Sequence, residues 1–95
     1  MVTAIMLMNV DRKRVNDIAG ELAEIEGVSE VYSVGGRYDL VAVVRVKENN
    51  RLAELATRRL ASIDGIESTE TLIAFEAHSR HDLEAMFSIG LDEEA

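Results

Sequence analysis

Apolar residues along this chain follow two spacings, which alternate in the order strand, helix, strand, strand, helix, strand. Four segments rich in Val, Ile, Thr or Tyr are predicted strands, and they cover residues 2–10, 29–34, 39–47 and 67–76. Between them, apolar residues recur every three or four positions, as on one face of a helix. The first such stripe is Val15, Ile18, Ala19, Leu22 and Ile25, and the second is Leu52, Leu55, Ala56, Leu60 and Ile63.

The two halves of this pattern are related by a weak internal repeat with an offset of 38 residues. Residues 25–28 read Ile-Glu-Gly-Val, and residues 63–66 read Ile-Asp-Gly-Ile. In each half the glycine, Gly27 or Gly65, lies just beyond the apolar stripe and is predicted to end the helix. Each half therefore reads as strand, helix, glycine stop, strand.

Polar residues mark where the helices begin. Asp11 is the predicted N-cap of the first helix, and Asn49 or Asn50 is the predicted N-cap of the second. Gly20 lies inside the first helix, where glycine lowers stability relative to alanine. Close packing of the helix on the sheet is the expected compensation.

This order of elements predicts an α+β domain with the ferredoxin-like βαββαβ topology. Two right-handed βαβ units put both helices on one face of a four-stranded antiparallel sheet. We assign residues 1–76 to this domain and residues 77–95 to a C-terminal tail. A short third helix is predicted in the tail, beginning at Ser79 and carrying an apolar stripe. That stripe is Leu83, Met86 and Phe87.

The first and third strands are apolar on both of their faces. Ile5 and Leu7 alternate with other apolar residues along the first strand, and so do Val41 and Val43 along the third. A half-solvated antiparallel sheet would instead alternate apolar with polar residues. Because the helices cover one face only, the second face is expected to be an apolar patch of the kind that marks an interface. The sequence therefore predicts a dimer that buries these four residues between facing sheets.

Composition argues against several classes of function. The formal net charge is −8, so the chain has few Lys and Arg side chains with which to neutralise DNA phosphates, and direct DNA binding is not expected. Its basic runs, 12–14 and 58–59, are interpreted as solvated helix faces. The chain has no cysteine, which excludes disulfides and thiolate metal sites. The apolar run 2–8 is too short to span a membrane and lacks the flanks of a signal peptide, so we expect a cytoplasmic protein.

Residues that could carry catalysis are few. His78 and His81 stand three positions apart beside acidic residues, but two histidines without a spaced third ligand are better interpreted as a charged helix start than as a metal site. No nucleophile elbow or phosphate-binding glycine loop is present. We therefore predict no catalytic residues, no metal and no cofactor.

The loop between the second and third strands has the most suggestive chemistry. An ordinary hairpin turn accounts for Gly35 and Gly36 but not for Tyr38 and Asp39 at the start of the next strand. Glycine N–H groups can approach a small anion closely, and the aspartate can hold a cation or brace the turn. The tyrosine ring can cover the site. Together these groups suit the two charged ends of an α-amino acid.

The run Gly36-Arg37-Tyr38-Asp39 resembles the G-x-Y-D motif of the effector-binding (RAM) domain of the Lrp/AsnC family of transcription regulators. The preceding strand, and the closing segment 65–73 with its alternating threonines, also resemble that domain. The resemblance covers residues 1–76. Family regulators carry an N-terminal helix-turn-helix, whereas this chain begins at the first strand, so the resemblance is to the stand-alone sensing domain.

The resemblance implies an amino-acid-sensing and oligomerisation module rather than an enzyme. It implies sheet-to-sheet dimers that join into higher rings, with the effector bound between dimers near the G-x-Y-D loop. Full-length Lrp/AsnC regulators are a further implied partner, whose DNA binding the module would alter by co-assembly. The implied ligand-binding residues are Gly35, Gly36, Tyr38, Asp39, Thr69 and Thr71. Arg37 occupies the variable position of the motif, which leaves the identity of the effector open.

Two other functions fit the same topology. An ACT-like regulatory domain would also bind amino acids, and a small ferredoxin-like monooxygenase would place aromatic and His residues in a cavity beneath the sheet. The chain has two Tyr, two Phe and no Trp, which disfavours the enzyme. The G-x-Y-D loop after the second strand favours the Lrp/AsnC interpretation over both.

Overall fold

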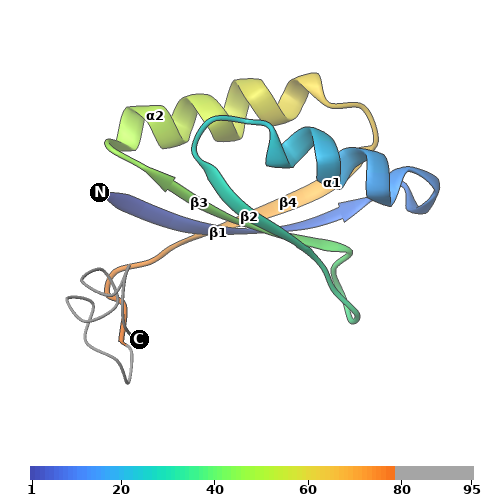
Figure 1. Cartoon of the computed structure of the whole chain (residues 1–95), viewed down its shortest axis with the longest axis horizontal. Helices are drawn as coiled ribbons and strands as arrows, with labels where there is room; N and C mark the ends of the chain where they lie inside the picture. The colour runs from blue at the N-terminus through green and yellow to red at the C-terminus, as the bar shows by residue number, and fades with distance from the viewer. Residues whose placement is uncertain (79–95) are drawn as a thin grey trace, which may run out of the picture.

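Within residues 1–78, which the computed structural model describes, four antiparallel strands form one sheet in the order β2-β3-β1-β4 (Figure 1). The strands are β1 (Val2–Val10), β2 (Val28–Ser33), β3 (Leu40–Val46) and β4 (Ile66–Ile73). Strand β3 pairs with β1 over its whole length, from Val46 with Val2 to Leu40 with Met8. The predicted ferredoxin-like α+β fold is confirmed.

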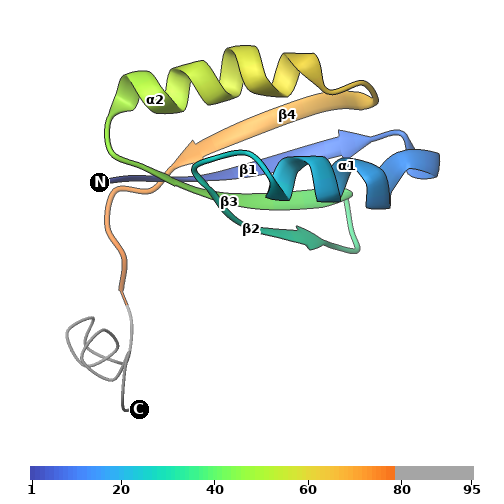
Figure 2. The same ribbon diagram turned by 45° about the horizontal axis from the view of Figure 1, so that its top comes forward.

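Both helices lie on the same face of the sheet (Figure 2). Helix α1 (Val15–Ala23) follows a 3₁₀ turn, η1 (Arg12–Arg14), and the Asp11 side chain accepts a hydrogen bond from the Lys13 N–H at 3.0 Å, as the predicted cap should. Helix α2 (Asn49–Glu54) continues through a π-helical segment, η2 (Leu55–Arg59), and a 3₁₀ turn, η3 (Leu60–Ser62).

The predicted cap of the second helix is wrong. Asn49 is already the first helical residue, and the extended residue before it is Glu48, whose side chain makes no capping hydrogen bond. Backbone bonds close this turn instead, because the N–H groups of Arg51 and Leu52 both donate to the Glu48 carbonyl.

Alternate residues of the central strands form the core between the sheet and the helices. From the sheet it takes Ala4, Met6, Met8, Val10, Leu40, Ala42 and Val44. From the helical segments it takes Ile18, Leu22, Ile25, Leu52, Leu55 and Leu60. Each of these residues is at most 6% exposed, and the helical members belong to the two stripes read from the sequence. Burying them supplies most of the driving force for folding, at about 25 cal/mol per Å² of apolar surface.

The opposite face of the sheet, here called the outer face, carries no helix from residues 1–78 (Figure 1). Ile5 and Leu7 point to it, together with their cross-strand partners Val43 and Val41, and all four are half-buried. At its margins Tyr32 is 50% exposed and Leu72 is 44% exposed. The predicted two-sided apolar character of the central strands is therefore confirmed, and the outer face is left without a cover in the described part of the chain.

The internal repeat has a structural cause in its two glycines. Gly27 and Gly65 have φ angles of 101° and 103°, in the left-handed region that favours glycine. A Cβ at either one would lie 2.9 Å from a side chain of the opposite half, at Val46 Cγ1 and Ile18 Cδ1 respectively. Each glycine carbonyl also accepts a hydrogen bond of 2.8 Å from a backbone N–H of the opposite half. Arg45 donates to Gly27, and Asp11 donates to Gly65. The repeat thus preserves the two turns where the halves meet.

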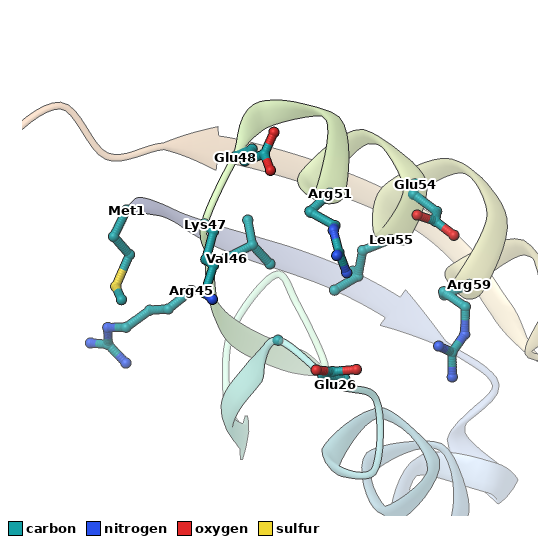
Figure 3. A pocket seen from close by; sticks show the side chains of 11 residues that line it. Met1, Glu26, Arg45, Val46, Lys47, Glu48, Arg51, Glu54, Leu55 and Arg59 are labelled. Atoms are coloured by element: carbon teal, nitrogen blue, oxygen red, sulfur yellow. The ribbon is translucent and has the colours of Figure 1, made fainter.

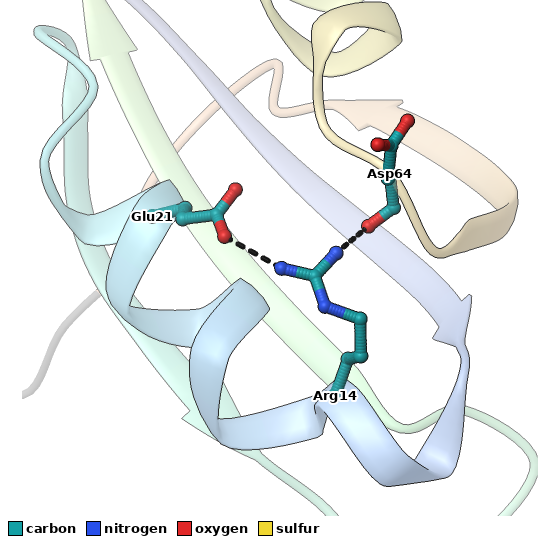
Figure 4. Close-up of polar contacts among 3 residues, drawn as sticks. All are labelled: Arg14, Glu21 and Asp64. Carbon is teal, nitrogen blue, oxygen red and sulfur yellow. Dashed lines mark hydrogen bonds and ion pairs between the residues drawn. The ribbon is translucent and has the colours of Figure 1, made fainter.

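Arg14 adds a polar tie at one of these turns. Its Nη2 lies 2.8 Å from Glu21 Oε2 on α1, and its Nη1 donates to the Asp64 carbonyl just before β4 (Figure 4). Both charged side chains are partly exposed, so the ion pair contributes at most about 1 kcal/mol. The tie therefore orients the start of α1 rather than holding the two halves together.

Gly20 does not have the packing role expected for it. It is exposed, and a Cβ placed on it would have no atom outside its own helix neighbourhood within 4 Å. The core members of α1 are Ile18 and Leu22, on either side of it in sequence, so Gly20 faces away from the sheet. The tail helix predicted from Ser79 onward, including the Leu83, Met86 and Phe87 stripe, lies outside the described residues.

Alanine at two glycines is expected to have opposite effects on stability. Gly20→Ala should stabilise the domain by about 0.5–1 kcal/mol, because alanine is the better helix former and fits without contact. Gly65→Ala should destabilise it by about 1–3 kcal/mol, because its backbone conformation strains any residue with a Cβ. Thermal and urea unfolding at one protein concentration measure both changes. A Gly20→Ala protein that unfolds more easily than wild type would contradict this account of α1.

Candidate functional site

The loop from Gly35 to Asp39 is a hairpin connection closed by backbone pairing. Ser33 pairs with Leu40, and the Val34 N–H donates to the Asp39 carbonyl at 3.0 Å. Gly36 has a φ of 129°, so the turn requires glycine there, whereas Gly35 has no positive φ and an open surrounding. Of the two glycines, Gly36 is the one that the loop's shape depends on.

Asp39 is held in place by three hydrogen bonds. Its N–H donates to the Met8 carbonyl at 2.9 Å, its carbonyl accepts from Val34, and its Oδ2 accepts the Val10 N–H at 2.9 Å. The carboxylate therefore braces the turn against β1, one of the two roles expected from the sequence. Its other oxygen, Oδ1, makes no hydrogen bond to residues 1–78 and is available to a ligand.

Tyr38 links the loop to the far edge of the sheet. Its hydroxyl donates to Glu70 Oε1 on β4 at 2.7 Å. This hydrogen bond to a carboxylate, with smaller contributions from desolvation and from the negative charge of Glu70, raises the pKa of Tyr38 above its usual value. A tyrosine is already protonated at neutral pH, and the raised pKa keeps the phenol donating to Glu70 to higher pH.

A shallow depression beside the loop brings together side chains of both charges. Its lining comprises Asn9, Val10, Arg12, Gly36, Arg37, Asp39, Glu67 and Ser68. Two cations and two carboxylates thus surround one opening, with the Ser68 hydroxyl and the Asn9 amide between them. Such an arrangement can pair with a ligand that carries a negative and a positive end.

The residues predicted for ligand binding are not all brought together. Gly36 and Asp39 line the depression, whereas Gly35, Tyr38 and the two threonines of β4 do not. Thr69 and Thr71 pair with Met8 and Met6, whose side chains are in the core, so both threonines belong to the helix side of this exposed edge strand. Glu70, between them, points to the outer face, which is where the Tyr38 hydroxyl meets it.

Four polar lining residues outside the loop were not anticipated from the sequence. Arg12 belongs to a basic run that was interpreted only as a solvated helix face. Asn9 and Ser68 pair across β1 and β4, and the Asn9 amide donates to the Ser68 hydroxyl at 3.2 Å. Glu67 precedes Ser68 on the same strand. The signal that could have found them is the change from apolar to polar residues where β1 ends.

Two absences are established for residues 1–78 alone. No helix there is long and apolar enough to cross a membrane. No three His, Cys, Asp or Glu side chains gather there in a way that could hold a metal ion. His78 lies 3.1 Å from Glu76 at an exposed position, and its predicted companion His81 lies outside the described residues.

Comparison with known proteins identifies relatives of the whole domain. The family model described as the Lrp/AsnC ligand binding domain matches residues 3–83. The HTH-type transcriptional regulator FL11 of Pyrococcus furiosus is 30% identical over 77 residues, which cover 81% of this chain and 50% of the regulator. This chain thus spans about half the length of the curated relatives it matches.

Solved structures give the same result. The crystal structure of TTHA0845 from Thermus thermophilus is 45% identical, covers 84% of this chain and all of its own, and superposes with a TM-score of 0.79. The transcriptional regulator NMB0573 of Neisseria meningitidis, solved as an L-Met complex, has a TM-score of 0.73 at 13% identity, over 83% of this chain and 54% of its own. The latter likeness is one of fold alone. The chain belongs to the Lrp/AsnC ligand-binding-domain family, whose members are related to transcription regulators.

Proposed function

We propose that this chain acts in the cytoplasm as a non-catalytic module that senses a small molecule, an amino acid, and that assembles through its outer face. The observation that carries the proposal is that one small domain has both an uncovered apolar sheet face and a depression beside the loop that is lined by side chains of both charges. Membership of a ligand-binding-domain family supports the sensing role. DNA contacts would be left to full-length relatives with which the module co-assembles.

The outer face supports the assembly part of this proposal. Ile5, Leu7, Val41 and Val43 form a continuous apolar centre, because they are cross-strand partners on the two central strands. Part of their margin is polar, since Glu30 pairs with Val43 and Glu70 with Leu7, whereas Tyr32 and Leu72 extend the apolar surface. An apolar centre with a polar margin is the usual composition of a protein interface. We infer that a second copy of the chain covers the outer face. In a two-fold dimer the same patch of both copies forms the interface, so one apolar face is sufficient.

The outer face can be tested with a single charge. Val43→Asp should convert the dimer to a monomer, because an unpaired carboxylate in a closed apolar interface costs on the order of 3–5 kcal/mol, at least about a hundredfold in the dimer's Kd. Ala53→Asp, on the exposed side of α2, is the matched control and should leave the dimer intact. Analytical ultracentrifugation measures both, with circular dichroism to check folding. A wild-type protein that sediments as a monomer at micromolar concentration would refute the assembly.

The depression beside the loop supports the sensing part. Arg12 and Arg37 offer guanidinium groups to a carboxylate, and Asp39 Oδ1 and Glu67 offer acceptors to an ammonium group. These groups come from three separate segments, so the fold rather than a local motif assembles them. NMB0573, which shares this fold over 54% of its own chain, was solved as a complex with L-Met, and this supports an amino acid as the ligand class. Val10 is the depression's one large apolar residue, and it is nearly fully buried, so apolar surface for a ligand side chain would have to come from a second copy.

Asp39 gives the sharpest test of this site. Some common amino acid should bind wild type with a Kd between about 1 µM and 1 mM, worth roughly 4–8 kcal/mol. Asp39→Asn should weaken it at least tenfold, because the amide removes the charge that faces the ammonium group. The same amide keeps an acceptor for the Val10 N–H, so the fold should change less than in Asp39→Ala. Gly36→Val should also abolish binding while leaving the dimer intact.

Isothermal titration calorimetry across the common amino acids measures these affinities. Arg58→Gln is the control, because Arg58 is exposed and does not line the depression. Binding should also raise the melting temperature as ligand concentration increases, since the ligand stabilises the state that holds it. The sensing proposal fails if no amino acid binds wild type, or if Asp39→Asn and Gly36→Val bind as tightly as wild type.

A further inference from the structure

A second cavity, of about 460 Å³, lies at the other end of the sheet (Figure 3). It is bounded by the end of β3, the first turns of α2 and the turn that joins α1 to β2. Gly27, Val46 and Leu55 pack closely at its base, since a Cβ on Gly27 would lie 2.9 Å from Val46 Cγ1 and 3.5 Å from Leu55 Cδ1. No residue of the loop 35–39 lines it, so this cavity is separate from the proposed amino-acid site.

The lining of this cavity is rich in cations for so acidic a chain. Its basic residues are Arg45, Lys47, Arg51 and Arg59, four of the ten in the sequence, and its acidic residues are Glu26, Glu48 and Glu54. Neither of the two ion pairs found within residues 1–78 involves any of these seven side chains. Arg51 and Arg59 are therefore free to meet a ligand, whereas the Arg45 side chain extends away from both of them (Figure 3).

The backbone of the second helix aligns two of these cations. Arg51, Leu55 and Arg59 are spaced four apart, so they lie near one helix face. In a regular α-helix, residues eight apart would still drift about 80° around the axis. Here the Leu60 N–H donates to the Leu55 carbonyl five residues back, in the π-helical segment Leu55–Arg59. A π-helical turn holds more residues than an α-helical turn, so the chain rotates less around the helix axis at each residue. This smaller rotation brings the Arg59 side chain back toward the direction of Arg51.

The side-chain directions agree with this backbone geometry (Figure 3). Arg51 and Arg59 extend from α2 toward the turn that carries Glu26, on either side of the buried Leu55. Glu48 points away from that side of the helix. The two guanidinium groups therefore face the same open space, and π-helical distortions of this kind are frequent at functional sites.

We propose that this cavity is a second ligand site and that it binds a small molecule through a phosphate group. Arginine side chains pair bidentately with phosphate oxygens, and two guanidinium groups that face one space attract a dianion more strongly than a single carboxylate. Glu26, Glu48 and Glu54 also line the cavity, but a free amino acid would offer the two arginines only one negative charge. The site goes beyond the proposed amino-acid sensing and would give the module a second input.

Calorimetry with inorganic phosphate and with adenosine monophosphate tests the site, against acetate at constant ionic strength. Both phosphate compounds should bind wild type with a Kd of about 1 mM or tighter, and acetate should bind more weakly. Preference for the nucleotide would indicate an organic phosphate, and equal affinity would indicate the phosphate group alone. The inference is wrong if neither compound binds more tightly than acetate.

Four substitutions locate the site, at Arg51 in α2 and at Arg58 and Arg59 in η2. Arg51→Gln and Arg59→Gln should each weaken phosphate binding at least fivefold, and Arg51→Lys should weaken it less because it keeps the charge. Arg58→Gln removes the same charge from a neighbouring exposed residue outside the cavity and should bind like wild type. If Arg58→Gln loses as much affinity as Arg51→Gln, binding reflects the general charge of the helix and the site is overturned.

Amino-acid titrations on the same variants separate the two proposals. Arg51→Gln and Arg59→Gln should bind an amino acid as wild type does, and Asp39→Asn should bind phosphate as wild type does. Phosphate binding without amino-acid binding would refute the sensing proposal and leave this site standing. Amino-acid binding without phosphate binding would do the reverse.

Discussion

The rest of this structure depends on one constraint: its two central strands are apolar on both faces, whereas its helices can cover only one. The inner face, with Met6 and Met8 fully buried, is satisfied within the chain. The outer face, with Ile5 and Val43 at its centre, is not. Strands made only for a two-layer monomer would carry polar residues there, as β4 does over most of its length. Residues 1–78 thus leave an apolar second face, which the proposed assembly would cover.

Most of the fold could be predicted because its signals are local and repeated. Helical stripes, strand composition and the glycines at 27 and 65 each mark an element without reference to the rest of the chain, and they agree in both halves. Sequence reasoning failed at two local features of the helices. Gly20 lies between Ile18 and Leu22 and so faces away from the sheet, where it has no packing role. The start of α2 is closed by the Glu48 carbonyl rather than by either asparagine side chain.

The candidate site was predictable only in part, for a physical reason. Gly36 and Asp39 could be found because a turn with positive φ and a carboxylate at its foot leave a recognisable run of residues. Arg12 and Glu67 could not, because they lie far from that run in sequence and reach it only through the pairing of β1 with β4. The sequence did not show which face of the sheet the threonines of β4 occupy. Because side chains alternate along a strand, Thr69 and Thr71 lie on the opposite face from Glu70.

The positions of the sites determine how they could influence one another. The depression proposed to bind an amino acid lies where β1 ends, beside the pairing of Met8 with Leu40. The cavity proposed to bind a phosphate group lies where β1 begins, beside the pairing of Val2 with Val46. Nine strand residues separate the two ends, roughly 30 Å, too far for one ligand to act on the other directly. The outer face lies along the same central strands between them. Any coupling between the two ligands would therefore pass through assembly. If assembly increases the affinity for a ligand by some factor, that ligand must increase the assembly constant by the same factor.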